Sequence, residues 1–197
     1  MSELIILCRP EEMDEARGLG YRLACAAWQV GKDGRLWRSP IPRLERGSLM
    51  AVWGGAEGAR LQSDIAAECT HIGIDEVLWL DKIRSTAISG GNVSEYLKGE
   101  KDVFIEPLRH CFTLPSRSGN GTPINEMRLE KFRATAECRG FSRELGCKYF
   151  IWEGGCVLYD DAESIGWKIK LLQALGAERI ILPYSSKRVR GFLRARP

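Results

Sequence analysis

The clearest prediction of the fold comes from YFIWEGGCVLYDDAESIGWKIKLLQALGAERIILPY, residues 149–184. Two apolar runs flank Glu153-Gly154-Gly155, a pattern typical of a β-hairpin with a glycine-containing turn. A helical pattern follows and ends at Gly176, and the continuous apolar run 179–182 is typical of a strand buried on both faces. The apolar residues with helical spacing are Ile165, Ile169, Leu172 and Leu175.

The predicted helix begins in Asp160-Asp161-Ala162-Glu163, which supplies an aspartate N-cap and an acid three residues later, a variant of the capping box. In this interpretation Asp160 caps the helix, and Asp160→Ala is expected to cost about 1 kcal/mol. Ile169→Asp, in contrast, is expected to abolish folding, because it puts an unpaired carboxylate into the core at a cost of several kcal/mol.

The same alternation of apolar strands and helices is found in the rest of the chain. A parallel sheet covered by helices gives this pattern, because its strands are buried on both faces. A complete barrel of eight strand–helix units usually has about 250 residues, and this chain has 197. We therefore predict an α/β fold, a compact or incomplete TIM-type barrel, with an open doubly wound parallel sheet as the alternative. The other predicted strands are 4–8, 21–28, 49–53, 76–80, 103–105 and 111–114. The other predicted helices are 11–17, 57–71 and 127–138. Thr122-Pro123 is expected to supply the N-cap and the first helical residue before the last of these helices.

Composition and charge fit one globular domain over residues 1–186 and a basic tail over residues 187–197. Apolar residues make up 44% of the chain, and no apolar run approaches the roughly 18 residues that a membrane-spanning helix needs. The net charge is +3, and the tail carries five basic and no acidic side chains. Such a tail can bind nucleic acid, but a solvated end is the favoured interpretation, because no basic patch interleaved with aromatic residues occurs elsewhere. We expect neither a membrane nor nucleic acid as a partner.

The seven cysteines show none of the paired spacings of a metal site. No Cys-x-x-Cys occurs, and the two histidines, His71 and His110, are isolated, whereas a zinc site needs four converging ligands. We interpret the thiols as reduced and packed in the core, and we expect no metal and no cofactor. Reduced thiols and an N-terminus without the features of a signal peptide predict a cytoplasmic location. The sequence does not indicate which oligomeric state the protein has.

The stretch 149–165, with Lys168 and Leu175-Gly176-Ala177 after it, resembles the C-terminal end of the family 18 glycoside hydrolases. The similarity is closest to the spore and cell-wall type, which acts on peptidoglycan or chitin-like N-acetylhexosamine polymers. In that family a hairpin leads into a Tyr-Asp-Asp-x-x-Ser-Ile segment, a helix with an inward lysine and the last barrel strand. The resemblance implies a barrel of the same type and a glycan as the ligand.

The family's catalytic pattern, Asp-x-x-Asp-x-Asp-x-Glu at the fourth barrel strand, is broken in the matching stretch GIDEVLWLDK, residues 73–82. In the family the glutamate protonates the leaving oxygen, and the preceding aspartate orients the acetamido group that attacks the sugar carbon. Asp75 matches the first aspartate, but leucines occupy the inner positions. Lys82, or Asp81 after a shift of one residue, falls at the position of the acid. We therefore predict a non-catalytic protein that binds a glycan or another partner.

Residues at strand ends are the candidate site residues, because barrel active sites form there. Asp81 and Glu106 end neighbouring predicted strands and can form an acid–base pair, so an active glycosidase on peptidoglycan or chitin-like polymers is the alternative. In the purely structural interpretation, Asp81 pairs with Lys82 or Arg84 and Glu106 caps a turn. A regulatory or nucleic-acid-associated module acting through the basic tail is a third possibility. The predicted ligand-binding residues are Trp53, Asp75, Glu76 and Tyr184.

Overall fold

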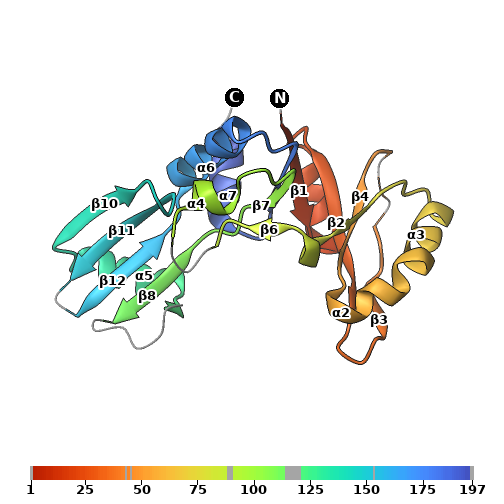
Figure 1. Cartoon of the computed structure of the whole chain (residues 1–197), viewed down its shortest axis with the longest axis horizontal. Helices are drawn as coiled ribbons and strands as arrows, with labels where there is room; N and C mark the ends of the chain where they lie inside the picture. Colours follow the sequence, from red (N-terminus) through yellow and green to blue (C-terminus); the bar gives the residue numbers. More distant parts are fainter. Residues whose placement is uncertain are drawn as a thin grey trace.

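The structure, a computed structural model, describes residues 2–42, 44, 46–87, 91–113, 121–152 and 154–195. It contains two sheets, which lie in two lobes (Figure 1). We call residues 109–159, which hold the second sheet, the inserted lobe, and the rest of the chain the barrel lobe.

Seven parallel strands of the described barrel lobe form a curled sheet, a half-barrel. Neighbouring strands pair in the order β5-β4-β2-β1-β13-β7-β6, so the first strand of the chain pairs with the last. The prediction of an α/β fold with an incomplete TIM-type barrel is confirmed. The short strand β3 (Leu36–Arg38) adds an antiparallel partner to β2. The parallel strands are β1 (Glu3–Cys8), β2 (Arg22–Val30), β4 (Leu49–Trp53), β5 (Val77–Trp79), β6 (Arg84–Ser85), β7 (Asp102–Phe104) and β13 (Arg179–Pro183).

Each face of the curled sheet packs into its own apolar cluster. Alternate residues of a strand point to opposite faces, and in β1 Ile6 and Cys8 join the outer cluster whereas Ile5 and Leu7 join the inner one. The outer cluster holds the buried apolar residues of the surrounding helices, and the inner one fills the curl. These helices are α1 (Met13–Arg17), α2 (Gly55–Gly58), α3 (Gln62–His71), α4 (Val93–Tyr96), α6 (Ala162–Ala174) and α7 (Lys187–Arg194), with short 3-10 turns η1 (Pro10–Glu12), η2 (Ala59–Leu61) and η3 (Leu80–Lys82).

The inserted lobe follows β7 and ends before α6. Its strands are antiparallel in the order β10-β11-β12-β8-β9, and the hairpin predicted on either side of residue 153 is confirmed as β11 and β12. Among the described residues of this lobe, six buried residues form its apolar cluster. The elements are β8 (Arg109–Thr113), β9 (Thr122–Pro123), α5 (Glu126–Ala134), β10 (Cys138–Ser142), β11 (Cys147–Trp152) and β12 (Gly155–Tyr159).

Two predictions in this lobe are wrong. The run 111–114 was expected as a strand of the parallel sheet, but residues 111–113 pair antiparallel with β12; Leu114 lies outside the described residues. Thr122-Pro123 forms strand β9 instead of opening a helix, and Asn125 caps α5 by accepting the Arg128 N–H at 2.9 Å. Asparagine is a more favourable N-cap than threonine, so the local sequence also allowed the start of the helix that the structure shows.

Residues 187–194, expected to belong to a solvated tail, form helix α7. Val189, Phe192 and Leu193 are buried in the outer cluster, and their spacing of three and four residues places them on one helix face. Two of the basic residues in this helix form ion pairs, Arg188 with Glu126 and Arg194 with Glu15. The segment is therefore a packed element of the barrel lobe.

The junction of the two lobes contains a buried ion pair in place of the predicted Asp160 cap. Asp161, not Asp160, caps α6 and accepts the Ser164 N–H at 3.0 Å. Asp160 and Lys168 are both fully buried, and Lys168 Nζ donates to Asp160 Oδ2 at 2.6 Å. The same Oδ2 accepts the Leu108 N–H at 2.7 Å, and the Leu108 carbonyl accepts the Asp160 N–H at 2.9 Å. Asp160 therefore joins the chain entering the inserted lobe to the chain leaving it.

The predicted packing of cysteines in the core is confirmed for five of them. Cys8, Cys25, Cys69, Cys111 and Cys147 are buried free thiols, and Cys138 is exposed. Burial raises the thiol pKa of both Cys8 and Cys147 to about 12. No described helix has the length and apolar character required to cross a membrane.

Candidate ligand-binding cleft

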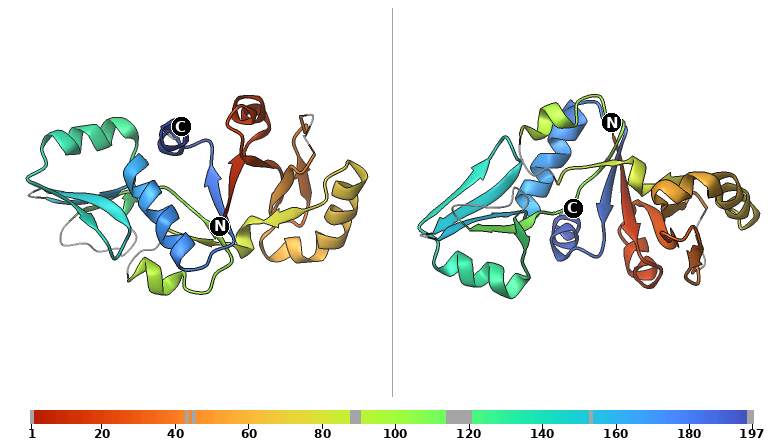
Figure 2. Two further views of the ribbon diagram at one scale, coloured as in Figure 1. Left: turned by 90° about the horizontal axis from the view of Figure 1, so that it is seen from above. Right: turned by 60° about the horizontal axis from the view of Figure 1, so that its bottom comes forward.

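A cleft of about 680 Å³ lies where the two lobes meet. Its barrel-lobe side is made by residues at the carboxyl ends of β4, β7 and β13, the edge at which barrel proteins carry their sites. The start of α7 also lines it, and Figure 2 shows α7 between the two lobes. The lining residues are Trp53, Phe104, Glu106, Pro107, Arg109, His110, Pro123, Ile124, Glu126, Pro183, Ser185, Ser186, Lys187 and Arg188.

Three charged side chains from distant parts of the sequence meet in this cleft. Arg109 Nη1 and Arg188 Nη2 each donate to Glu126 Oε2 at 3.1 Å. Arg188 also donates through Nη1 to the Leu108 carbonyl at 3.2 Å, which ties α7 to the start of the inserted lobe. One carboxylate is thus shared by two guanidinium groups.

Trp53 and Glu106 are the two predicted site residues that line the cleft. Trp53 ends β4 and is 44% exposed, a large apolar surface at a strand end. Glu106 follows β7 and accepts the Ser85 hydroxyl at 2.9 Å, while its own N–H donates to the Thr86 hydroxyl at 3.2 Å. A ring and a carboxylate in one cleft suit the apolar face and the hydroxyl groups of a sugar.

Asp81 does not line the cleft with Glu106. Its Oδ1 accepts the Gly54 N–H at 2.8 Å and so joins the ends of β4 and β5. The ion pairs expected for it do not form either, because Lys82 lies over the Trp79 ring and Arg84 pairs with Glu100. The structure therefore does not bring the proposed acid–base pair together in this cleft.

Asp75 and Glu76 lie before β5, at the opposite end of the sheet from the strand ends that line the cleft. Asp75 is exposed. Glu76 forms ion pairs with Arg179 and with Arg22, the latter at 3.2 Å. Hydrogen bonding to Asp102, with the nearby Glu76 charge, holds the pKa of Arg179 above its ordinary range. Glu76 therefore belongs to an ion-pair network that joins the starts of several strands.

Tyr184 follows β13 but is buried, with 1% of its surface exposed. Burial, with a smaller contribution from a hydrogen bond to Glu15, raises the pKa of its hydroxyl. Arg190 lies over its ring at 5.5 Å. The side chain packs in the core and does not line the cleft.

The described residues contain no group of three or more His, Cys, Asp or Glu side chains that could hold a metal ion. His110 lines the cleft, and its buried Nδ1 has no hydrogen-bond partner among the described residues.

No protein-family model and no curated protein matches this sequence. Solved structures do match. The spore cortex-lytic enzyme SleL of Bacillus megaterium is similar over 98% of this chain and 73% of its own, with a TM-score of 0.62 and 13% identity. The class V chitinase of Nicotiana tobaccum (TM-score 0.56, 9% identity) and a chitinase of Rhizomucor miehei (TM-score 0.54, 12% identity) are each similar over 98% of both chains. The chain has the fold of the family 18 chitinases and of SleL, as the sequence resemblance predicted.

Sequence reasoning did not single out Arg109, Glu126 or Arg188. They meet because α7, which follows β13, packs beside the inserted lobe. No local sequence pattern predicts such a contact. The one available signal was the apolar spacing in residues 187–194, which indicates a helix rather than a tail. A packed helix at that position would have placed Arg188 near a strand end.

Proposed function

We propose that the protein binds a glycan in this cleft and does not hydrolyse it. The observation that carries the proposal is Trp53, whose exposed ring lines a cleft at the carboxyl ends of the half-barrel strands. An aromatic ring offers a flat apolar surface to the C–H face of a sugar, and the polar groups around it can bind the hydroxyls. The tobacco chitinase of this fold has been solved in complex with NAG4, which supports a glycan as the ligand class.

The arrangement of carboxylates supports binding without hydrolysis. Glycosidases of the two-carboxylate type need an acid and a second carboxylate on either side of the scissile bond. Asp81 lies outside the cleft, and Glu126, which lines it, is held by two arginines. Among the described lining residues, Glu106 is then the one carboxylate that no arginine holds, so a second carboxylate for hydrolysis is missing. In the strand-four pattern, leucines replace the inner aspartates, and Lys82, or Asp81 after a shift of one residue, stands at the position of the family's acid.

The nucleic-acid alternative has less support, because helix α7 uses its basic residues within the protein. Arg188 and Arg194 form ion pairs, and Arg190 donates to the Tyr184 carbonyl at 3.2 Å. These contacts leave few cations for a phosphate backbone.

Calorimetric titration with the N-acetylglucosamine tetramer and with soluble peptidoglycan fragments tests the proposal. We expect saturable binding, and we expect Trp53→Ala to weaken it about tenfold or more, because the stacking surface is lost. Trp37→Ala is the matched control, since Trp37 is 63% exposed on β3 and does not line the cleft.

A parallel assay for new reducing ends should stay at background. Absence of binding to every glycan, or equal losses in the two tryptophan variants, would contradict glycan binding in this cleft. Release of reducing ends at ordinary enzyme rates would contradict the absence of hydrolysis.

A further inference from the structure

We infer that the cleft selects glycans that carry a carboxylate group over neutral glycans. This inference rests on the proposed function and narrows its ligand class. It comes from the charges that line the cleft, which a neutral polymer of N-acetylglucosamine would leave unused.

The first observation is the sharing of Glu126 by Arg109 and Arg188. Two guanidinium groups bind one carboxylate, so the group of three keeps one positive charge. Arg109 bonds Glu126 through Nη1 and has no other hydrogen bond from its guanidinium to a described residue. Its side chain is 39% exposed, so its remaining donors can bind a carboxylate in the paired geometry that arginine favours.

The second observation is Lys187, the first residue of α7. It lines the same cleft, it is exposed, and it forms no ion pair with any described residue. With this unpaired ammonium group, the described lining has three basic side chains against the two acids Glu126 and Glu106, a net charge of +1. Glu106 is the remaining acid of the lining, and it accepts a hydroxyl hydrogen bond from Ser85, as it would from a sugar.

These groups can contact different parts of one acidic sugar. Trp53 can stack on the ring, Glu106 can accept a hydroxyl, and the cations of β8 and α7 can bind the carboxylate. Charge-assisted hydrogen bonds are about twice as strong as neutral ones, so the carboxylate should contribute to selectivity. A uronic acid and a lactyl ether on an amino sugar both present this group, and the probes must distinguish them.

The test compares acidic and neutral probes of equal length by calorimetry. Tetragalacturonic acid is paired with the N-acetylglucosamine tetramer, and the disaccharide of N-acetylglucosamine and N-acetylmuramic acid with the N-acetylglucosamine dimer. We expect at least one acidic probe to bind about tenfold more tightly than its neutral counterpart, the gain that one charge-assisted hydrogen bond supplies. Binding of galacturonate alone would assign a uronic acid, and binding of the muramic disaccharide alone would assign the lactyl carboxylate.

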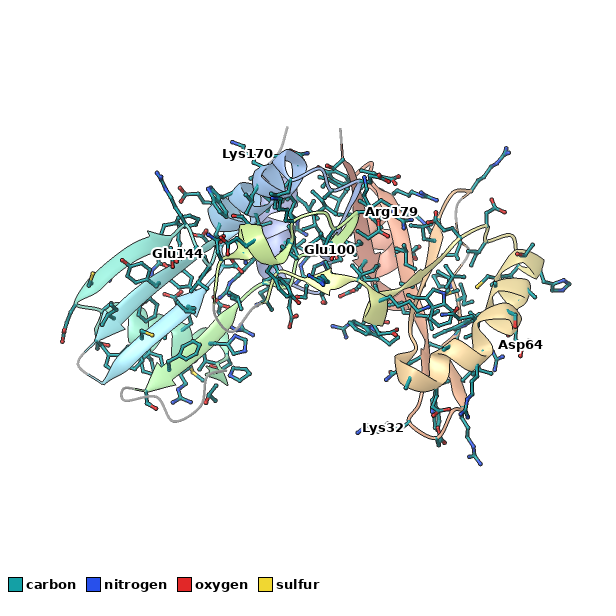
Figure 3. The ribbon with its side chains drawn as sticks, viewed as in Figure 1. Lys32, Asp64, Glu100, Glu144, Lys170 and Arg179 are labelled. Carbon is teal, nitrogen blue, oxygen red and sulfur yellow. The ribbon has the colours of Figure 1, made fainter. Side chains whose placement is uncertain are left out.

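Lys187→Gln should bring the acidic-to-neutral affinity ratio down several-fold, and about 0.5 M NaCl should lower the ratio of the parent protein as well. Lys170→Gln is the matched control. It removes the same charge from an exposed residue of α6 that points away from the molecule in Figure 3, and it should keep the ratio of the parent protein.

Equal affinity for acidic and neutral probes, or equal changes in the two lysine variants, would overturn the inference and leave glycan binding in place. If no probe binds at all, the proposed function fails, and this inference fails with it.

Discussion

The two lobes are stabilised in different ways. The barrel lobe has parallel strands with apolar clusters on both faces, and its central residues, such as Ile5 and Ile6, are fully buried. The described part of the inserted lobe has an antiparallel sheet with one cluster of six buried residues. So small a core is marginal by itself. The inserted lobe must therefore depend on its attachment to the barrel lobe, and that attachment is a buried polar cluster around Asp160 rather than an apolar contact alone.

The cleft depends on this attachment as well, because both lobes line it. The Leu108 carbonyl accepts hydrogen bonds from Asp160 and from Arg188, so one residue connects the buried ion pair to the charges of the cleft. A change at Asp160 should therefore alter the inserted lobe first, and the barrel lobe only afterwards.

The largest expected effect is that of Asp160→Ala. It leaves the buried ammonium group of Lys168 without its partner and removes the acceptor of the Leu108 N–H, and we expect a loss of about 3–5 kcal/mol in the free energy of unfolding. Asp161→Ala, one residue away, removes a partly exposed cap together with a surface ion pair to Lys148, and should cost about 1–2 kcal/mol. Urea unfolding of both variants measures the difference.

Adding Lys168→Met to Asp160→Ala should recover part of the loss, because no charge then remains buried without a partner. Equal losses in Asp160→Ala and Asp161→Ala would show that the buried pair is not what holds the lobes together.

A smaller effect, confined to the inserted lobe, is expected from Gly155→Ala. A methyl group at this position of β12 would overlap the backbone carbonyl oxygen of Phe112 on β8, and backbone cannot move aside as a flexible side chain can. We expect a loss of about 1–3 kcal/mol. Hydrogen exchange should become faster at the amides of β8 and β12 and stay slow in β1.

Gly191→Ala is the control for this substitution. Gly191 lies inside helix α7 with open space around the added methyl group, and alanine there should stabilise the protein by up to about 1 kcal/mol. Faster exchange in β1 as well as β12 after Gly155→Ala would mean that the two lobes unfold together.

The two lobes also differ in how far the sequence could predict them. Six of the seven parallel strands of the described barrel lobe and the hairpin of residues 147–159 were predictable, because continuous apolar runs and a glycine turn are local signals. The two-residue strand β6 has no apolar run and was not predicted. The partner of β8 was not, because a short apolar run has the same appearance in a parallel and an antiparallel sheet.

The candidate site was predictable only in part, and for the same reason. Trp53 and Glu106 were found because the end of a strand can be located locally. Asp160 was mistaken for the cap because Glu163, three residues later, completes the capping pattern for Asp160, whereas in the structure Ser164 completes it for Asp161. Arg109 and Arg188 meet through Glu126 although they lie far apart in the sequence, and such proximity is set by the tertiary fold alone.

The smallest expected effect at neutral pH is that of the buried thiols of the barrel lobe, which change stability only above about pH 9. Burial, with a smaller contribution from Glu12, raises the pKa of Cys8 from 9.0 to about 12. Between these values the unfolded chain has lost the proton that the folded protein keeps, so the folded state binds more protons and stability falls as pH rises. Below about pH 9 this thiol takes nothing from the free energy of unfolding, because it keeps its proton in both states. Above about pH 9 the free energy of unfolding falls by up to about 1.4 kcal/mol per pH unit. Cys8→Ala should therefore flatten the decline in unfolding free energy between about pH 9 and pH 11, measured by urea titration. Cys138→Ala removes an exposed thiol of the inserted lobe instead and should keep the slope of the parent protein. If Cys8→Ala kept that slope as well, the Cys8 thiol would be accessible to water, and the barrel lobe would be less tightly closed than its core indicates.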